Sequence, residues 1–176
     1  MLKYLEIHLT DHCNLNCRGC SHFSPLVNKP FFKDYDEYKK EMSRLAEITN
    51  QEIRVIRLMG GEPFLNPKIL DFCKATRFFF PRAEISIVSN GILLHTLDNE
   101  IIKKYNDLNI KLCISNYHIN IDTEKFNKFN LHDYDEKNKM YNIGLDLKGT
   151  QKIDYSFYNC DHVIHGCYCL KSGRIY

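Results

Sequence analysis

The sequence lacks three features that would place it in common classes of protein. It has no apolar run close to the roughly 20 residues that a membrane-spanning helix needs, and its first residues contain no apolar core of a secretory signal peptide. It also has no stripe of like charge, because its 24 Lys and Arg and 22 Asp and Glu are interspersed. We therefore expect a cytoplasmic protein without a nucleic-acid or membrane partner.

Internal repeats and low-complexity linkers are absent as well, and 176 residues suit one hydrophobic core. The eight cysteines are not expected to form disulfides in a cytoplasmic protein, which favours metal or cluster binding. Cys73 and Cys113 are exceptions. They fall on the apolar face of a predicted helix and inside a predicted strand, where cysteine is typical of the core.

Strand-like and helix-like segments alternate along the chain. The expected strands are 3–9, 53–59, 84–88, 110–114, 143–147 and a short one at Tyr155–Phe157; the expected helices are 35–48, one from Asn66–Pro67, 97–105 capped by Thr96, and 124–129. Alternation at this spacing predicts right-handed βαβ units in an α/β fold with a mostly parallel sheet. The composition changes only near residue 150, where a Cys-rich tail begins.

Three cysteines follow the first predicted strand with the spacing C-x3-C-x2-C, namely Cys13, Cys17 and Cys20. Cysteine thiolates are the usual ligands of iron–sulfur clusters, and a four-iron cluster normally takes four. Three ligands in one loop leave one iron open to a small molecule. A structural zinc site with His12 as the fourth ligand is the alternative.

Short polar or glycine-containing segments follow the next three predicted strands. They are Gly60-Gly61-Glu62-Pro63, Ser89-Asn90-Gly91 and Ser115-Asn116. Ligands of parallel α/β sheets bind at the carboxyl ends of the strands, so these segments and the cysteines are expected to share one edge. Each segment alone is also typical of an ordinary turn.

Together, the cysteine motif and the Gly-Gly-Glu-Pro segment resemble the radical S-adenosylmethionine (radical SAM) superfamily, over about residues 1–120. The resemblance implies a partial (βα)6 barrel, with residues 1–150 as the core, and a 4Fe–4S cluster on the three cysteines. It further implies an enzyme that cleaves SAM reductively to a 5′-deoxyadenosyl radical, which abstracts hydrogen from a substrate. A cluster-carrying binding or electron-transfer protein without SAM chemistry is the alternative.

The resemblance also implies roles for single residues. Glu62, with the backbone of Gly60 and Gly61, would hold the SAM ammonium group. Ser89 and Ser115 match positions that contact the ribose or carboxylate, and Asn90 is a further candidate. The family commonly has an aromatic residue before the third cysteine, where this chain has Gly19.

The tail, residues 151–176, contains Cys160, Cys167 and Cys169 and resembles the start of the auxiliary-cluster extension in SPASM and twitch radical SAM proteins. This implies a second iron–sulfur cluster; adventitious metal binding with His162 and His165 is the alternative. The family implies a small-molecule, peptide or sugar-related substrate and an electron donor such as flavodoxin or ferredoxin.

Overall fold

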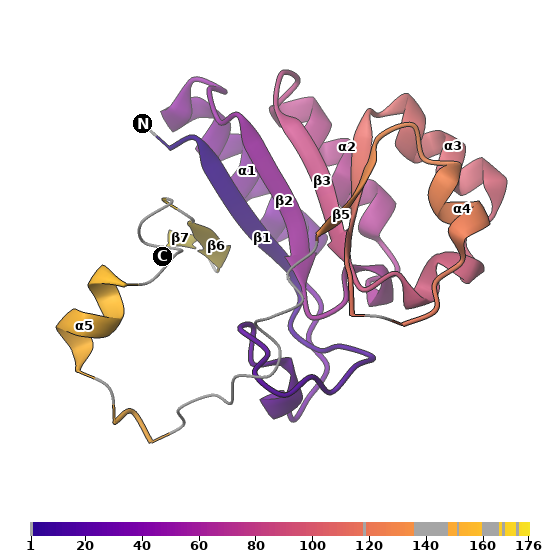
Figure 1. The fold of residues 1–176 in the computed structure, drawn as a ribbon. Helices are drawn as coiled ribbons and strands as arrows, with labels where there is room; N and C mark the ends of the chain where they lie inside the picture. Colours follow the sequence, from indigo (N-terminus) through magenta and orange to yellow (C-terminus); the bar gives the residue numbers. More distant parts are fainter. Residues whose placement is uncertain are drawn as a thin grey trace.

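A computed structural model describes residues 2–117, 119–135, 148–150, 152–159, 166, 168–171 and 173–176. Its strands form one sheet in the order β5-β4-β3-β2-β1-β6-β7 (Figure 1). The strand bounds are β1 Tyr4–Thr10, β2 Val55–Gly60, β3 Glu84–Ser89, β4 Ile110–Ser115, β5 His132–Asp135, β6 Cys169–Lys171 and β7 Arg174–Ile175. Every pairing is parallel except that of β6 with β7, which confirms the predicted α/β fold with a mostly parallel sheet.

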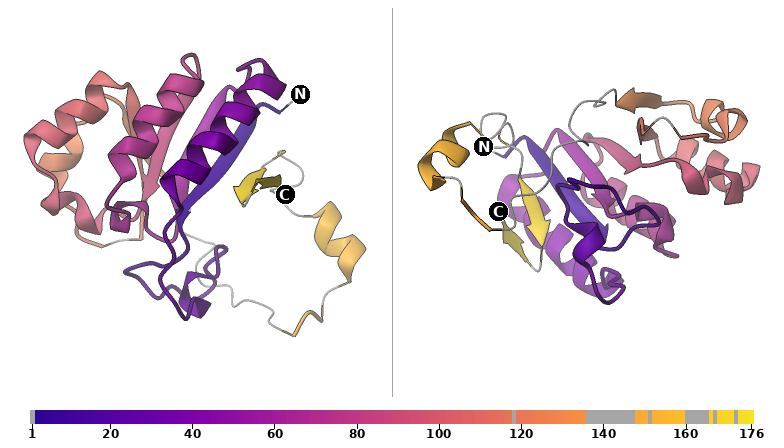
Figure 2. Two further views of the ribbon diagram at one scale, coloured as in Figure 1. Left: turned by 180° about the vertical axis from the view of Figure 1, so that it is seen from behind. Right: turned by 60° about the horizontal axis from the view of Figure 1, so that its bottom comes forward.

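Helices join the strands, and α1 and α2 lie on one face of the sheet. They are α1 Tyr35–Thr49, α2 Ile69–Phe79, α3 Asn99–Asp107, α4 Thr123–Asn127 and α5 Ile153–Tyr158, with short 3-10 helices η1 Ser24–Leu26, η2 Pro63–Leu65 and η3 Ile92–Thr96. In Figure 1, α1 and α2 lie behind the sheet, and in the reverse view of Figure 2 they lie in front of it. In the described part of the chain, no helix is long and apolar enough to cross a membrane.

The core lies between the sheet and these helices. Successive side chains of a strand point to opposite faces, so Leu5, Ile7 and Leu9 of β1 all face the helices and are at most 1% exposed. Phe72 of α2 packs edge-on against Tyr38 of α1, with ring centroids 4.8 Å apart. This packing explains why apolar residues recur at regular spacing in the strands and helices.

Two helices begin later than their sequence patterns predict. Helix α2 begins at Ile69. Asn66 makes the contact expected of a cap, since its side-chain oxygen accepts from Lys68 N (2.9 Å), and its amide nitrogen donates to Leu9 O (2.8 Å). Similarly, Thr96 ends η3, and Asp98 caps α3 by accepting from Ile101 N at 2.7 Å.

The end of the chain differs most from the sequence-based expectation. Tyr155 and Phe157 belong to α5 and not to a strand. Both side chains are largely exposed, so the alternation of apolar residues there does not mark a buried face. Strand β5 pairs with β4 although its sequence is polar, because it lies at the edge of the sheet. The hairpin of β6 and β7 was not predicted, and β6 pairs with β1. The predicted strand 143–147 lies outside the described residues.

Candidate functional site at the carboxyl ends of the strands

A small cavity, partly open to solvent, lies at the carboxyl ends of β1 to β4. Its lining includes eight of the nine residues predicted for the first site, namely Cys13, Cys17, Cys20, Gly60, Gly61, Ser89, Asn90 and Ser115. Segments up to about a hundred residues apart in the sequence therefore meet at the carboxyl edge of the sheet, as the sequence analysis predicted.

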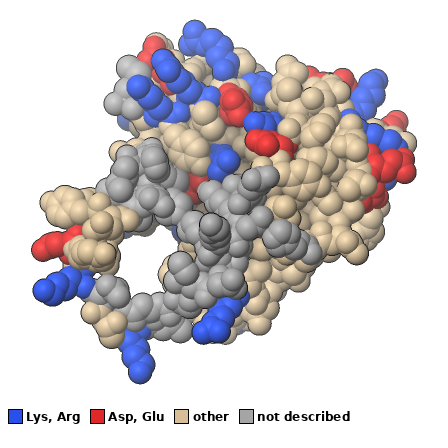
Figure 3. Space-filling model, in the orientation of Figure 1, with Lys and Arg blue, Asp and Glu red and all other residues tan. Residues whose placement is uncertain are grey.

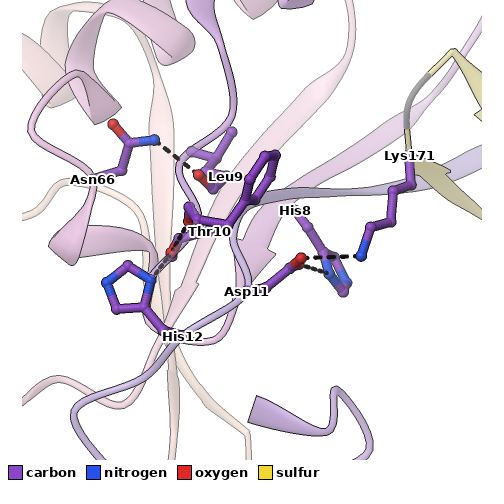
Figure 4. Close-up of polar contacts among 8 residues, drawn as sticks. His8, Leu9, Thr10, Asp11, His12, Asn66 and Lys171 are labelled. Carbon is purple, nitrogen blue, oxygen red and sulfur yellow. Dashed lines mark hydrogen bonds and ion pairs between the residues drawn. The ribbon is translucent and has the colours of Figure 1, made fainter. Parts of the chain in front are cut away.

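The loop that carries Cys13, Cys17 and Cys20 (below, the rim cysteines) is fastened at its base. Thr10 Oγ1 donates to Phe31 O at 2.7 Å and lies 2.6 Å from His12 Nδ1 (Figure 4). A hydroxyl has one hydrogen, so His12 Nδ1 is the donor to Thr10. The His12 ring also packs edge-on against Phe32 at 4.9 Å. The His12 imidazole therefore helps to fasten the base of the loop.

The rim cysteines differ in their hydrogen bonds. Burial raises the pKa of the Cys20 thiol, but hydrogen bonds from the His22 side chain and from the backbone of Ser24 and His22 outweigh burial and lower the pKa to about 7. Burial raises the pKa of Cys13 and of Cys17. Ser24 also lines the cavity, and its buried hydroxyl has no hydrogen-bond partner among the described residues.

The donor set fits a polynuclear cluster better than a single ion. In the part of the chain that the structure describes, no three His, Cys, Asp or Glu side chains converge on a point suited to one metal ion. The rim cysteines instead line a shared cavity, and cluster ligands bind different irons. The residues present therefore fit a 4Fe–4S cluster.

The glycine pair allows the turn after β2 to press against the start of the cysteine loop. Gly60 has φ +136°, and a Cβ there would lie 2.0 Å from Thr10 O; a Cβ on Gly61 would lie 2.0 Å from His12 O. In the actual structure, Gly61 N donates to Thr10 O at 2.9 Å. Only glycine permits this approach, so the pair is more than an ordinary turn.

Glu62 lies behind the cavity wall and is fully buried. Its carboxylate accepts from Phe64 N (3.1 Å), Ser89 Oγ (2.8 Å) and Asn90 N (2.9 Å). Burial raises the pKa of Glu62, and these three hydrogen bonds counteract the rise. The carboxylate thus joins the turn after β2 to the turn after β3, while the backbone of Gly60 and Gly61 lines the cavity.

Asn90 links the turn after β3 to the cysteine loop. Its amide nitrogen donates to Asn14 Oδ1 at 2.7 Å and lies 3.7 Å from Cys13 Sγ. Sequence reasoning missed the other lining residues, which are Leu15, His22, Ser24, Met59, Val88 and Tyr117. The closeness of His22 to Cys20 in sequence was the available signal for one of them.

A chain of polar contacts runs from the cavity to the tail. The His22 side chain hydrogen-bonds to Cys20, and its ring packs edge-on against His8 at 4.8 Å. His8 Nδ1 lies 3.5 Å from Asp11 Oδ1, and Asp11 Oδ2 pairs with Lys171 Nζ at 3.0 Å (Figure 4). These contacts hold β6 beside the cysteine loop.

The remaining cysteines divide into two groups. Cys73 and Cys113 are buried, 0% and 5% exposed, which confirms their predicted place in the core. Cys169 is half-buried in β6, opposite Glu6 of β1. Cys160 and Cys167 lie outside the described residues, so the second cluster stays a prediction.

Comparisons of the sequence with known proteins point to one family. Residues 7–139 match the Radical SAM superfamily. A GTP 3′,8-cyclase of Clostridium perfringens (strain SM101) is 30% identical over 130 residues, which are 73% of this chain and 37% of the relative. A GTP 3′,8-cyclase of Heliobacterium modesticaldum is 28% identical over 102 residues, 57% of this chain and 30% of the relative. The chain thus spans about a third of the length of these relatives.

Solved structures share the fold. BtrN in complex with S-adenosylmethionine and 2-DOIA has a TM-score of 0.56 at 20% identity, covering 76% of this chain and 57% of BtrN. The enzyme anSMEcpe with bound S-adenosylmethionine has a TM-score of 0.57 at 19% identity, covering 74% of this chain and 42% of anSMEcpe. Because the family match covers most of the chain, the chain belongs to the radical SAM superfamily, whose cofactors are a 4Fe–4S cluster and SAM.

Proposed function

We propose that the protein is a radical SAM enzyme whose rim cysteines hold the 4Fe–4S cluster. The observation that supports this best is the single cavity that the rim cysteines share with the glycine pair and the serines of β3 and β4. When bound, the cluster and SAM supply the reaction: one electron from an external donor cleaves SAM to methionine and a 5′-deoxyadenosyl group that takes a hydrogen atom from the substrate.

The chain's own residues bind and orient SAM in this proposal. The backbone of Gly60 and Gly61 receives the ammonium group, because no side chain intervenes there. The buried carboxylate of Glu62 lies behind this wall, and its negative charge attracts a cation placed on the cavity side. Ser89 and Ser115 offer hydroxyls, and Asn90 an amide, to the ribose or carboxylate of SAM.

The substrate and partners are proposed at a coarser level. The relatives named GTP 3′,8-cyclase support a small-molecule substrate, while a peptide or a sugar-related compound is compatible with the superfamily. An electron donor such as flavodoxin or ferredoxin would reduce the cluster. In this proposal residues 1–150 form the core, and residues 151–176 begin an extension with Cys160, Cys167 and Cys169 as ligands of a second cluster.

Anaerobic reconstitution with iron and sulfide, followed by reduction in the presence of SAM, tests the proposal. We expect about four irons per chain at the first site and release of 5′-deoxyadenosine. Cys17→Ala should lose that cluster and all SAM cleavage, whereas Cys169→Ala, the matched change outside the rim, should retain SAM cleavage at least in part.

Other outcomes favour the alternatives. A reducible cluster that never cleaves SAM would leave an electron-transfer or binding protein. Stoichiometric zinc without a brown chromophore would overturn both cluster-based functions. Equal loss of SAM cleavage in Cys17→Ala and Cys169→Ala would contradict the assignment of the rim cysteines as the catalytic set.

A further inference from the structure

Ser24 has a buried hydroxyl group at the wall of the cavity. The residue is 7% exposed and lines the cavity, and its Oγ has no hydrogen-bond partner among the described residues. Burying a hydroxyl without a hydrogen bond is costly. The other buried atom without a partner in the described part of the chain, Glu41 Oε2, belongs to a carboxylate whose second oxygen pairs with Lys33 Nζ at 2.8 Å. Ser24 is therefore the residue whose hydrogen bonding a ligand of the cavity would complete.

A tight turn holds Ser24 against Cys20. Phe23 N donates to Cys20 O at 3.0 Å, and Phe23 has the left-handed backbone conformation (φ 56°, ψ 22°), which reverses the chain just before Ser24. Helix η1 then begins at Ser24, whose carbonyl oxygen accepts from Val27 N at 3.1 Å. The Ser24 backbone N–H donates to the Cys20 sulfur. Because Oγ belongs to the same short residue as this N–H, the hydroxyl lies close to the Cys20 sulfur as well.

Hydrogen-bond donors gather around Cys20 more than around the other rim cysteines. Its sulfur receives hydrogen bonds from the His22 side chain and from the backbone of His22 and Ser24. The Cys13 sulfur accepts from Leu15 N at 3.4 Å. A cluster held by the rim cysteines would therefore have its most polar surroundings on the Cys20 side, where the Ser24 hydroxyl also lies.

The cysteine loop itself carries no negative charge. Residues 12–33 contain no Asp or Glu, and no acidic side chain is in view at the bottom of Figure 3, where Figure 1 shows this loop. The potential of an iron–sulfur cluster depends on its net charge, its exposure to solvent and the hydrogen bonds to its sulfurs. Reduction adds one negative charge to the cluster, so a hydrogen-bond donor at a sulfur stabilises the reduced form more than the oxidised form.

We propose that the Ser24 hydroxyl donates a hydrogen bond to a sulfur atom of the 4Fe–4S cluster on the Cys20 side, and that this bond makes the cluster easier to reduce. The inference rests on the proposed function, because it concerns the cluster of the same site. Ser24 binds no iron in this arrangement. Its hydroxyl completes the set of donors that begins with the backbone N–H of the same residue, and the turn at Phe23 keeps both donors in place.

Reductive titration of the reconstituted protein without SAM, followed by electron paramagnetic resonance, tests the inference. We expect Ser24→Ala to retain the iron content of the wild type. At the potential that reduces half of the wild-type cluster, the ratio of reduced to oxidised cluster in Ser24→Ala should be about threefold lower, a shift of about 28 mV for one electron. The matched control is Ser21→Ala, which removes an exposed hydroxyl from the same loop and should leave this ratio unchanged.

Two further comparisons separate the hydroxyl from the volume of the side chain. Ser24→Thr retains the hydroxyl, whereas Ser24→Val has the same shape without it, so the threonine variant should be the easier of the two to reduce. In the cluster-free protein, Ser24→Ala should not lower the midpoint of urea denaturation, because the hydroxyl has no partner there to lose.

Equal potentials for Ser24→Thr and Ser24→Val, or a lower urea midpoint for cluster-free Ser24→Ala, would overturn the inference. Release of 5′-deoxyadenosine is measured separately on the same wild-type sample after SAM is added. SAM cleavage by a cluster whose potential does not depend on the Ser24 hydroxyl would refute the inference alone. A cluster whose potential depends on the hydroxyl but which does not cleave SAM would refute the proposed function alone.

Discussion

The two faces of the sheet are built from the same strands, yet their side chains have different roles. On β1, Leu5, Ile7 and Leu9 are buried against the helices, whereas Glu6 and His8 point to the opposite face and make polar contacts. An offset of one residue therefore separates the side chains that stabilise the fold from those that are available to a ligand.

The energetics of the two faces differ accordingly. Apolar burial contributes about 25 cal/mol per Å², whereas a net hydrogen bond contributes about 1 kcal/mol. Changes on the helix-covered face should mainly alter the free energy of unfolding. Changes at the carboxyl edge and on the polar face should alter binding more than stability.

Phe72→Ala should give the largest loss of stability, because Phe72 is 0% exposed and packs edge-on against both Tyr35 and Tyr38. We expect urea denaturation to show about 3–5 kcal/mol less stability. Phe78→Ala removes the same side chain from a position of the same helix that is 76% exposed, and should cost less than about 0.5 kcal/mol. Similar losses from both variants would show that the helix-covered face does not dominate stability.

Glu62→Gln should have an intermediate effect, because it keeps the shape of a buried side chain that accepts hydrogen bonds from Phe64 N, Ser89 Oγ and Asn90 N. The amide places a donor opposite one of these donors, which should lower the free energy of unfolding by about 2 kcal/mol, and the loss of charge should weaken SAM binding. The exposed Glu84, which pairs with Lys111 at 3.8 Å, is the control, and Glu84→Gln should change stability by less than about 0.5 kcal/mol. An unchanged unfolding curve for Glu62→Gln would contradict the joining role of the carboxylate.

The carboxyl edge could be predicted from sequence because topology alone places its parts. The apolar alternation of Leu5, Ile7 and Leu9 locates β1, and parallel strands bring the segments that follow them to one edge. The role of Glu62 could not be predicted in the same way. Its hydrogen bonds to Ser89 and Asn90 span 27 and 28 residues and depend on how two turns pack.

The errors in the predicted helices and strands have similar causes, namely contacts with residues far away in the sequence. Asn66 has the sequence pattern of a helix cap and accepts from Lys68 N, but regular helix begins only at Ile69, and its amide nitrogen also donates to Leu9 O on a strand 57 residues earlier. The polar β5 is stabilised as an edge strand by its pairing with β4, which no local pattern reveals. Tyr155 and Phe157 show the reverse error, since a strand-like alternation occurs there in an exposed helix.

The smallest expected effect is a difference in thiol reactivity among the rim cysteines, which leaves the fold unchanged. In the cluster-free protein, hydrogen bonds from His22 and from the backbone of Ser24 outweigh burial and lower the pKa of Cys20 to about 7, whereas burial raises the pKa of Cys17. Because the thiolate is the reactive form, iodoacetamide should modify Cys20 with a midpoint near pH 7, and the other two only at higher pH. Trypsin cleaves after Arg18, so mass spectrometry measures Cys20 in a different peptide from the one that contains Cys13 and Cys17.

His22→Phe should move the midpoint of Cys20 modification to higher pH and leave the unfolding curve unchanged. A shared midpoint for all three thiols would show that these hydrogen bonds do not distinguish the cysteines.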